Sequence, residues 1–266
     1  MTTKPQQFFR LCEIDVLTRS NCKIKDPEHV LKIINNIISG GNKELQIVTD
    51  FDFTLTKQKT HDEKPVLSSF GMFRKCKSLP TSFLEDTKKL YEIYRPIEIC
   101  PKITQNEKRK HMIDWWVQSR DLLKGFPFDS TEIEQLAKEY GHVLRDGTHD
   151  IFSLSEEMNV PILVFSAGLG DSIRAILRHE QIFFPNVKLV SNFLKYDNGL
   201  LNGFSDDYPL IHTFNKNETV LEGTEYYDMV HNRKNVILMG FVMIPFRLIT
   251  LCVTKNLTDM KDTISA

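Results

Sequence analysis

The hydrophobic pattern divides the chain into two kinds of sequence. Four short runs rich in apolar and β-branched residues have the length of buried strands, at residues 46–49, 161–165, 187–191 and 235–240. Asp197-Asn198-Gly199 adds the signature of a hairpin turn. Between residues 61 and 147 strand-like runs nearly vanish, and amphipathic helical patterns replace them. The pattern therefore predicts an α/β core that is interrupted by a helical insertion.

Capping residues place the helices. Asp26-Pro27, an N-cap followed by a first-turn proline, begins a helix that Gly40-Gly41 ends. In the insertion, Thr104 and Glu107 form a capping box, and we predict three helices there, over residues 83–94, 105–124 and 131–140. We therefore divide the chain into a helical cap, residues 60–146, and two parts of the core, residues 1–59 and 147–266.

Composition limits the class of protein. With 266 residues, 41% of them hydrophobic, the chain can bury a sizeable core. Its formal net charge of −1 gives no electrostatic footprint for nucleic acid, and the basic run Lys108-Arg109-Lys110 fits a solvated helix face. The cysteines contain no Cys-x-x-Cys pair, and the N-terminus carries no secretory signal. We expect a cytoplasmic monomer that binds no nucleic acid.

Residues 236–253 raise the question of a membrane anchor. They form a nearly continuous apolar run of about the length of a membrane span. Pro245 and Arg247 lie inside this run, and a central arginine costs roughly 2.5–3.5 kcal/mol on insertion scales. We therefore prefer a protein without a membrane segment and keep the anchor as the weaker alternative.

Two acids follow the first apolar run and are the first candidates for chemistry. Asp50 and Asp52 come directly after residues 46–49, so they lie at the sheet edge where α/β proteins bind ligands. Strand alternation would direct both carboxylates to one side, so that one could attack while the other transfers a proton. The competing interpretation is a strand that ends in two solvated acids.

Two further segments have the chemistry of a phosphate site. Ser166-Ala167-Gly168-Leu169-Gly170 follows the second run and precedes a predicted helix, whose free N–H groups and dipole favour an anion. An ordinary glycine-rich turn between strand and helix explains the same pattern. The stretch of residues 211–217 places Lys216 after a short β-like segment, where a lysine is usually solvated.

The Asp50-x-Asp52-x-Thr54 pattern resembles the first motif of the haloacid-dehalogenase-like phosphatases. Several longer strings are similar to the cytosolic 5′-nucleotidase III family: Leu45–Asp52, Ile97-Glu98, Asp114-Trp115-Trp116, Phe165–Asp171, Val190-Ser191-Asn192 and His212–Lys216. The resemblance extends from about residue 26 to residue 240. It implies a Rossmann-like parallel sheet with an inserted helical cap that closes over the substrate.

The resemblance also implies a reaction on nucleoside 5′-monophosphates. Asp50 would be the nucleophile that forms an aspartyl-phosphate, and Asp52 would be the general acid and base. The carboxylate of Asp50 and the backbone carbonyl of Asp52 would hold Mg²⁺. The phosphoryl oxygens would be bound by Ser166, the amide of Ala167 and Lys216.

Several residues of the cap match positions that contact the substrate. Glu98 corresponds to the glutamate that reads the base, and Ser119 to a further substrate contact. The pair Trp115-Trp116 is similar to the branch that prefers 7-methylguanosine phosphate, whose charged ring stacks well on indole. Neighbouring helical residues point in different directions, so we predict that Trp116 stacks and that 7-methyl-GMP and CMP bind better than AMP. The alternative is that both tryptophans anchor the cap helix.

The resemblance stops after Gly240. The family continues with an Asp-Ser-x-Gly-Asp motif that supplies further metal carboxylates, whereas this chain continues with Phe241-Val242-Met243-Ile244. The spare acids nearest in sequence, none of which the sequence places at the metal, are Asp206, Asp207, Asp259 and Asp262. Three interpretations follow: an active nucleotidase, a catalytically impaired isoform or pseudoenzyme that binds nucleotide, and a product that does not fold stably.

Overall fold

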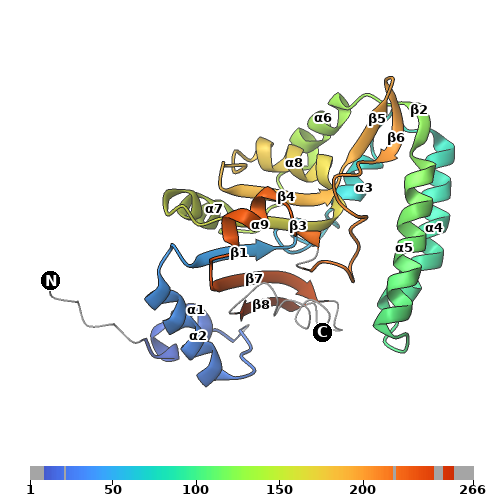
Figure 1. Cartoon of the computed structure of the whole chain (residues 1–266). Helices are drawn as coiled ribbons and strands as arrows, with labels where there is room; N and C mark the ends of the chain where they lie inside the picture. The colour runs from blue at the N-terminus through green and yellow to red at the C-terminus, as the bar shows by residue number, and fades with distance from the viewer. Residues whose placement is uncertain (1–8, 21, 218–219, 243–247, 255–266) are drawn as a thin grey trace.

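A five-stranded sheet forms the centre of the computed structural model, which describes residues 9–20, 22–217, 220–242 and 248–254 (Figure 1). Its strand order is β4-β3-β1-β7-β8. The first four are parallel to their neighbours and β8 is antiparallel to β7. The strands are β1 (Leu45–Thr49), β3 (Ile162–Leu169), β4 (Val187–Asn192), β7 (Asn235–Val242) and β8 (Leu248–Thr254). The predicted α/β core with four parallel strands is confirmed.

The continuous apolar pattern of the strands follows from burial on both faces. In β1, Ile47 packs into the large core cluster on one face, while Val48 packs into a second cluster on the other. Tyr226 is fully buried in this second cluster, and its hydroxyl donates to the Gln46 side chain at 3.0 Å. Because both faces of β1 are buried, a ligand can approach this strand at its carboxyl end and not along its faces.

Helices cover the sheet, and several have the predicted caps. In α2 (Pro27–Gly40), the Asp26 side chain accepts a hydrogen bond from the His29 amide, and Gly41 has a φ of +64° just beyond its end. These features confirm the predicted helix. The other helices outside the insertion are η1 (Leu11–Glu13), α1 (Asp15–Thr18), α7 (Thr148–Glu157), α8 (Gly170–His179) and α9 (Glu225–Val230).

The insertion contains four helices: α3 (Ser69–Phe73), α4 (Thr81–Ile99), α5 (Gln105–Leu122) and α6 (Thr131–Tyr140). The capping box of Thr104 and Glu107 at the start of α5 is confirmed, as are the predicted bounds of α6. The helix predicted over residues 83–94 is longer in the structure, since it continues past Pro96 to Ile99. α4 and α5 form a long hairpin at one side of the molecule (Figure 1), whereas α6 packs on α8 of the core.

A small antiparallel sheet joins the insertion to the core. Its order is β2-β6-β5, with β2 (Lys124–Pro127), β6 (Leu200–Phe204) and β5 (Leu194–Asp197). Asn198 and Gly199, with φ of 48° and 80°, form the predicted hairpin turn between β5 and β6. Because β2 belongs to the insertion and β6 to the second part of the core, the two parts are held together by backbone hydrogen bonds.

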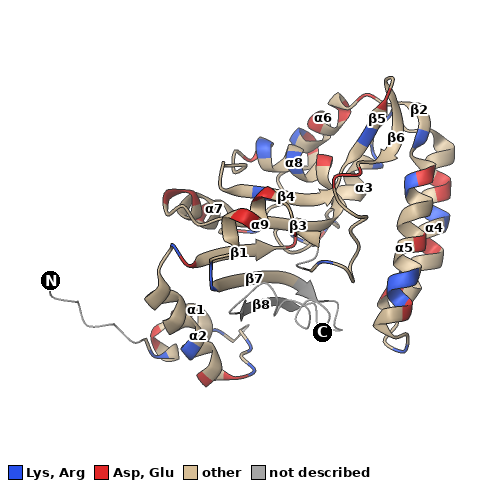
Figure 2. Ribbon diagram, viewed as in Figure 1, with Lys and Arg blue, Asp and Glu red and all other residues tan. Residues whose placement is uncertain are grey.

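Two features of the surface bear on the expectations from composition. Figure 2 shows acidic and basic residues interspersed along α4 and α5, so the hairpin carries both signs of charge. The apolar stretch 236–253 contributes strands β7 and β8 to the sheet. Within the described ranges, no helix is long and apolar enough to cross a membrane. The sequence analysis did not predict β8, which pairs with β7 from Val236↔Thr254 to Val242↔Leu248.

Candidate active site

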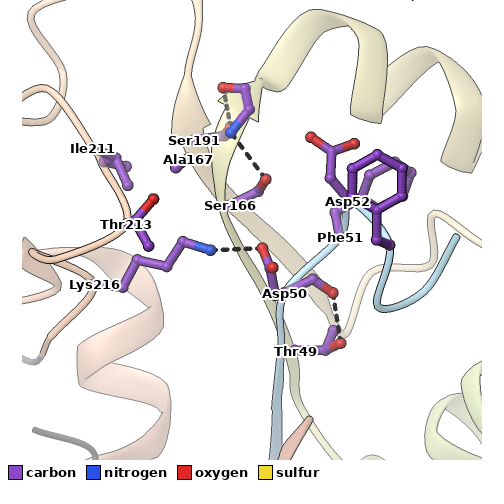
Figure 3. Close-up of polar contacts among 12 residues, drawn as sticks. Thr49, Asp50, Phe51, Asp52, Ser166, Ala167, Ser191, Ile211, Thr213 and Lys216 are labelled. Atoms are coloured by element: carbon purple, nitrogen blue, oxygen red, sulfur yellow. Dashed lines mark hydrogen bonds and ion pairs between the residues drawn. The ribbon is translucent and has the colours of Figure 1, made fainter. Parts of the chain in front are cut away.

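Asp50 and Lys216 form an ion pair at the carboxyl end of β1. Asp50 follows the last residue of the strand, and its amide donates to the carbonyl of Met239 on β7 at 3.0 Å. The Lys216 Nζ atom lies 2.6 Å from Asp50 Oδ1 (Figure 3). The lysine side chain is only 9% exposed and that of Asp50 25%. Lys216, which sequence reasoning alone would leave in solvent, therefore lies inside the site.

Asp52 occupies a tight turn rather than a strand. The amides of Thr54, Leu55 and Thr56 all converge on the carbonyl of Phe51, so the turn, and not strand alternation, brings the second acid to the site. The Asp52 carboxylate accepts hydrogen bonds from the Ser69 amide and hydroxyl, both at 2.7 Å.

The environment of Asp52 raises the pKa of its carboxyl group. Burial of the carboxylate raises its pKa to about 6, and the nearby charge of Asp50 adds to this effect. The hydrogen bonds from Ser69 act in the opposite direction without offsetting burial. An acid with a pKa near 6 can both donate and accept a proton close to neutral pH.

Arg145 holds the turn that carries Asp52. Phe53 has a φ of +63°, a backbone conformation that costs energy for a side chain of its size. The Arg145 guanidinium donates to the carbonyls of Phe53 at 3.0 Å and Thr54 at 2.8 Å. Its own amide donates to the carbonyl of Leu55 at 2.8 Å. The turn is therefore fixed from outside by a residue 92 positions away in sequence.

Gly168 allows β3 to approach the acids closely. A Cβ at this position would lie 2.0 Å from Ser69 Oγ and 2.7 Å from Asp52 Oδ2, so any side chain here would displace the hydroxyl that binds Asp52 or the carboxylate itself. Its amide donates to Ser166 Oγ at 3.0 Å, which leaves the serine hydroxyl proton free to point elsewhere. β3 extends through this segment to Leu169, beyond the predicted strand end at residue 165. The predicted phosphate-site residues thus lie on the end of a strand that precedes α8.

The segment that carries Lys216 is a loop, and the predicted β-like element at residues 211–217 is wrong. The Asn192 side chain binds both the amide and the carbonyl of Ile211, each at 2.9 Å. The Asn215 side chain accepts from the His212 amide at 2.7 Å. Burial lowers the pKa of His212 to about 4, so its ring stays neutral and accepts from the Phe214 amide at 3.2 Å. Asparagine side chains, and not a neighbouring strand, therefore bind the backbone of this loop.

Glu98 of α4 reaches across to the same loop. One carboxylate oxygen accepts from the Thr213 hydroxyl at 2.6 Å, and the other pairs with Arg95. On α5, Arg109 donates to the Phe214 carbonyl at 3.0 Å, and Lys108 lies 5.5 Å from the centre of the Phe214 ring. The basic run expected to be a solvated face therefore makes two contacts between cap and core.

The two tryptophans have different neighbours. Trp115 stacks on Tyr94 with ring centres 5.8 Å apart and planes within 12°. Trp116 lies edge to face with Phe70 at 6.0 Å and with Phe204 at 5.7 Å. Ser119, one turn further along α5, is buried. Phe70 directly follows Ser69, the residue bound to Asp52. Trp116 is therefore the tryptophan whose ring is linked to the acid site.

The oxygen donors at this edge suit Mg²⁺ in kind. The predicted ligands are the Asp50 carboxylate and the Asp52 backbone carbonyl, and magnesium is often held by one or two carboxylates together with water and substrate phosphate. The acids Asp206 and Asp207 do not add to this set, because they pair with Lys195 and Ser205 on the exposed β5–β6 side of the molecule. Asp259 and Asp262 lie outside the described residues.

Sequence reasoning missed Ser69 and Arg145. No motif surrounds either residue, and both act on Asp52 or its turn through contacts between segments far apart in the chain. The only available signal was indirect: a glycine at position 168 implies a close neighbour, but the neighbour's identity depends on the fold.

Comparisons with known proteins identify the family of the chain. A sequence model of the family described as pyrimidine 5′-nucleotidase (UMPH-1) matches residues 53–244. A 7-methylguanosine phosphate-specific 5′-nucleotidase from Drosophila melanogaster is 53% identical over 232 residues, which cover 87% of this chain and 72% of the relative. A Homo sapiens protein of the same description is 33% identical over 229 residues, 86% of this chain and 75% of the relative.

A solved structure shows the same fold. The cytosolic 5′-nucleotidase IIIB bound to cytidine is 52% identical and superposes with a TM-score of 0.81, covering 86% of this chain and 76% of that chain. Sequence and structure therefore agree on the fold over most of the chain. The chain belongs to the cytosolic 5′-nucleotidase III family of haloacid-dehalogenase-like hydrolases.

Proposed function

We propose that this chain is a Mg²⁺-dependent 5′-nucleotidase that hydrolyses nucleoside 5′-monophosphates through an aspartyl-phosphate, with 7-methyl-GMP and CMP favoured. The observation that carries the proposal is the buried pair of Lys216 and Asp50 beside a protonatable Asp52. A carboxylate nucleophile, a proton donor and a cation for the phosphate are the groups that this reaction requires. The relatives' names and the bound cytidine support the choice of bases.

In the first half of the reaction, Asp50 attacks the phosphorus of the 5′-phosphate. A bond forms between a carboxylate oxygen and phosphorus while the bond from phosphorus to the nucleoside 5′-oxygen breaks. Asp52 donates its proton to that oxygen, so the nucleoside leaves as a neutral alcohol. With its pKa raised to about 6, Asp52 is protonated in about one tenth of molecules at pH 7.

In the second half, Asp52 acts as the base. It takes a proton from water, the water oxygen attacks the aspartyl-phosphate, and the bond between Asp50 and phosphorus breaks to release inorganic phosphate. Lys216 Nζ, the Ser166 hydroxyl and the Ala167 amide stabilise the charge on the phosphoryl oxygens. The Asp50 carboxylate and the Asp52 carbonyl would hold Mg²⁺, whose charge would offset the repulsion between Asp50 and the phosphate.

Base recognition belongs to the cap. We assign stacking to Trp116, because its neighbour Phe70 adjoins the residue that binds Asp52. Glu98 provides acceptors for the exocyclic amine of guanine or cytosine, and its bond to Thr213 keeps one oxygen directed at the core. Ser119 lies on the same helix as Trp116. AMP lacks the N1–H and N2 amine pattern of guanine, so it binds more weakly.

A nucleotide-binding protein with little turnover is the second candidate. It is favoured by one observation: β7 passes beside Asp50 at Met239 and ends with Phe241 and Val242, where the resemblance to the family implies metal-binding acids. Loss of one group that supports a bound metal typically lowers metal affinity or activity by roughly 10–100-fold. Nucleotide binding through Glu98 and Trp116 does not depend on these acids.

One experiment separates the two candidates. Phosphate release from 7-methyl-GMP is measured with the purified chain over a range of Mg²⁺, with Asp50→Asn as the control, and nucleotide binding is measured by calorimetry. We expect release that requires Asp50 and Mg²⁺ but is depressed by several orders of magnitude, together with preserved binding. A rate in the ordinary enzyme range, roughly 1–10³ s⁻¹ at millimolar Mg²⁺, contradicts the impairment. Release that Asp50→Asn does not change contradicts the nucleotidase, and equal affinity for AMP contradicts the proposed base preference.

A further inference from the structure

A cluster of three histidines and one glutamate lies at the far end of α8 from the active site. His179 ends α8 and Glu180 is its C-cap, while His142 follows α6 and His149 is the second residue of α7. One potential ligand atom each from His142, His179 and Glu180 lie within 4.8 Å of one another. The cluster thus brings together three segments that meet only through the fold.

The ligand atoms of this cluster are close together but poorly paired. His142 Nδ1 lies 3.0 Å from Glu180 Oε1, and His149 Nε2 lies 3.0 Å from Glu180 Oε2. His179 Nε2 is nevertheless a buried atom without a hydrogen-bond partner among the described residues. Buried polar atoms in proteins are nearly always paired, so an unpaired ring nitrogen in a cluster with His142 and Glu180 indicates that a further group binds there.

The backbone around the cluster is shaped to bring the rings together. Gly141 precedes His142, and a Cβ at this position would lie 3.2 Å from Cδ2 of His179 and 2.0 Å from the carbonyl of Ala137. The absence of a side chain lets the chain pass directly over the histidine ring. The rings of His142 and His179 consequently have centres only 5.1 Å apart.

We propose that His142, His179 and Glu180 bind a divalent transition-metal ion of the Zn²⁺ class. Two imidazole nitrogens and one carboxylate oxygen form a donor set that Zn²⁺ accepts in four-coordinate sites. Mg²⁺, which prefers oxygen ligands in octahedral geometry, is disfavoured here. His149 holds the second oxygen of Glu180 and so orients the carboxylate toward the ion. The fourth position opens to solvent, since the His142 side chain is 75% exposed.

The proposed site is separate from the phosphate site but is connected to the turn that carries Asp52. α8 runs from Gly170, near the active site, to His179, a distance of about 14 Å at 1.5 Å per residue. The residue after His142, Val143, accepts a hydrogen bond from the amide of Lys57 at 2.7 Å, and Arg145 holds the turn. An ion bound to His142 therefore fixes the start of the segment that supports the catalytic turn.

Calorimetry with Zn²⁺ on the metal-stripped full chain tests the site. Saturating Mg²⁺ is present so that it occupies the oxygen donors at Asp50. We expect one equivalent of Zn²⁺ to bind, and His142→Ala and Glu180→Gln to weaken this binding by about tenfold or more. His149→Ala, which removes only an orienting group, should weaken it less. His61→Ala is the matched control, because the His61 side chain is fully exposed and far from the cluster in sequence.

A second measurement keeps the result independent of folding. Zn²⁺ should raise the midpoint of thermal unfolding of the wild-type chain and of His61→Ala, but not of His142→Ala. His142 is mostly exposed, so its variant should unfold at the wild-type temperature without metal. The proposal is overturned if wild type and His142→Ala bind Zn²⁺ equally. It is also overturned if Asp50→Asn, rather than the cluster variants, abolishes binding.

Discussion

β1 and β7 are parallel neighbours that end at the same edge of the sheet and carry very different chemistry there. They pair from Leu45↔Asn235 to Thr49↔Met239. β1 is followed by a segment with two acids, whereas β7 extends further and ends with Phe241 and Val242. The β1 end is supported by contacts from Ser69, Arg145 and Lys216. Asp50, Asp52 and Lys216 thus gather at the end of β1, whereas β7 carries no acid from Asn235 to Val242. Under the proposed function, one strand keeps the groups for phosphoryl transfer while its neighbour supplies none for the metal.

The largest effect is expected from placing an acid at the end of β7, which gives this strand a carboxylate as β1 has. Phe241→Asp should raise both Mg²⁺ affinity and turnover by about 10–100-fold, since it adds a carboxylate at a position where the family resemblance implies a metal-binding acid. The matched control is Phe241→Asn, which has the same shape without charge. Phosphate release and Mg²⁺ titration provide the measurement. If the aspartate and asparagine variants behave alike, the missing acid is not the reason for weak turnover.

The support of the β1 turn can be tested at Arg145. Arg145→Ala removes hydrogen bonds to the carbonyls of Phe53 and Thr54. We expect kcat to fall by about tenfold, since a displacement of a catalytic group by about 1 Å can lower the rate by about 10²-fold. We also expect a loss of about 1–3 kcal/mol in the free energy of unfolding. Arg178→Ala, an exposed arginine on α8, serves as the control. An unchanged kcat in Arg145→Ala contradicts the positioning role.

The two acids of the β1 end should differ in their effect on stability. The pKa of Asp52 is raised in the folded state, so its contribution to stability is full below pH 4 and is lost as the pH rises through about 6. Asp52→Asn should therefore stabilise the chain at pH 8 by about 1–2 kcal/mol, after allowance for solvent screening. This gain should disappear toward pH 4.

Asp50 provides the contrast. Asp50→Asn leaves the buried Lys216 without its partner, so it should destabilise the chain at pH 8. Denaturant unfolding of both variants at pH 4, 6 and 8 gives the comparison. Variants that change stability in the same direction at pH 8 contradict the separate environments assigned to the two acids.

The smallest effect concerns base recognition, which should not depend on either strand. Thr213→Val removes the hydroxyl that donates to Glu98. The KM for 7-methyl-GMP should rise by about 2- to 5-fold, because the affected group is partly exposed to solvent, while kcat stays the same. Thr213→Ser should restore the wild-type value. A change in kcat instead of KM places the Glu98 contact in the chemistry rather than in binding.

The elements of the fold were largely predictable because they depend on local chemistry. The cap at Asp26, the capping box at Thr104 and the turn at Asn198-Gly199 act within a few residues, and buried parallel strands have a continuous apolar pattern that short windows detect. The predicted element at residues 211–217 failed because side chains of Asn192 and Asn215, rather than a neighbouring strand, bind its backbone. β8 was missed because the segment resembled neither a family strand nor a separate element.

The sequence by itself determined which residue types stand at the sheet edge. Asp50 and Asp52 follow the end of β1 within three residues of the chain, so a local pattern is enough to place them there. Only the tertiary structure decided which groups surround them: Ser69 from the insertion, Arg145 from the segment after α6, and Lys216 from a loop. The same holds for His142 and His179, which are separated by 37 positions yet have ring centres 5.1 Å apart. The physical reason is that burial and hydrogen bonding between distant segments set the pKa of Asp52 and the pairing of Lys216, and no local pattern encodes such contacts.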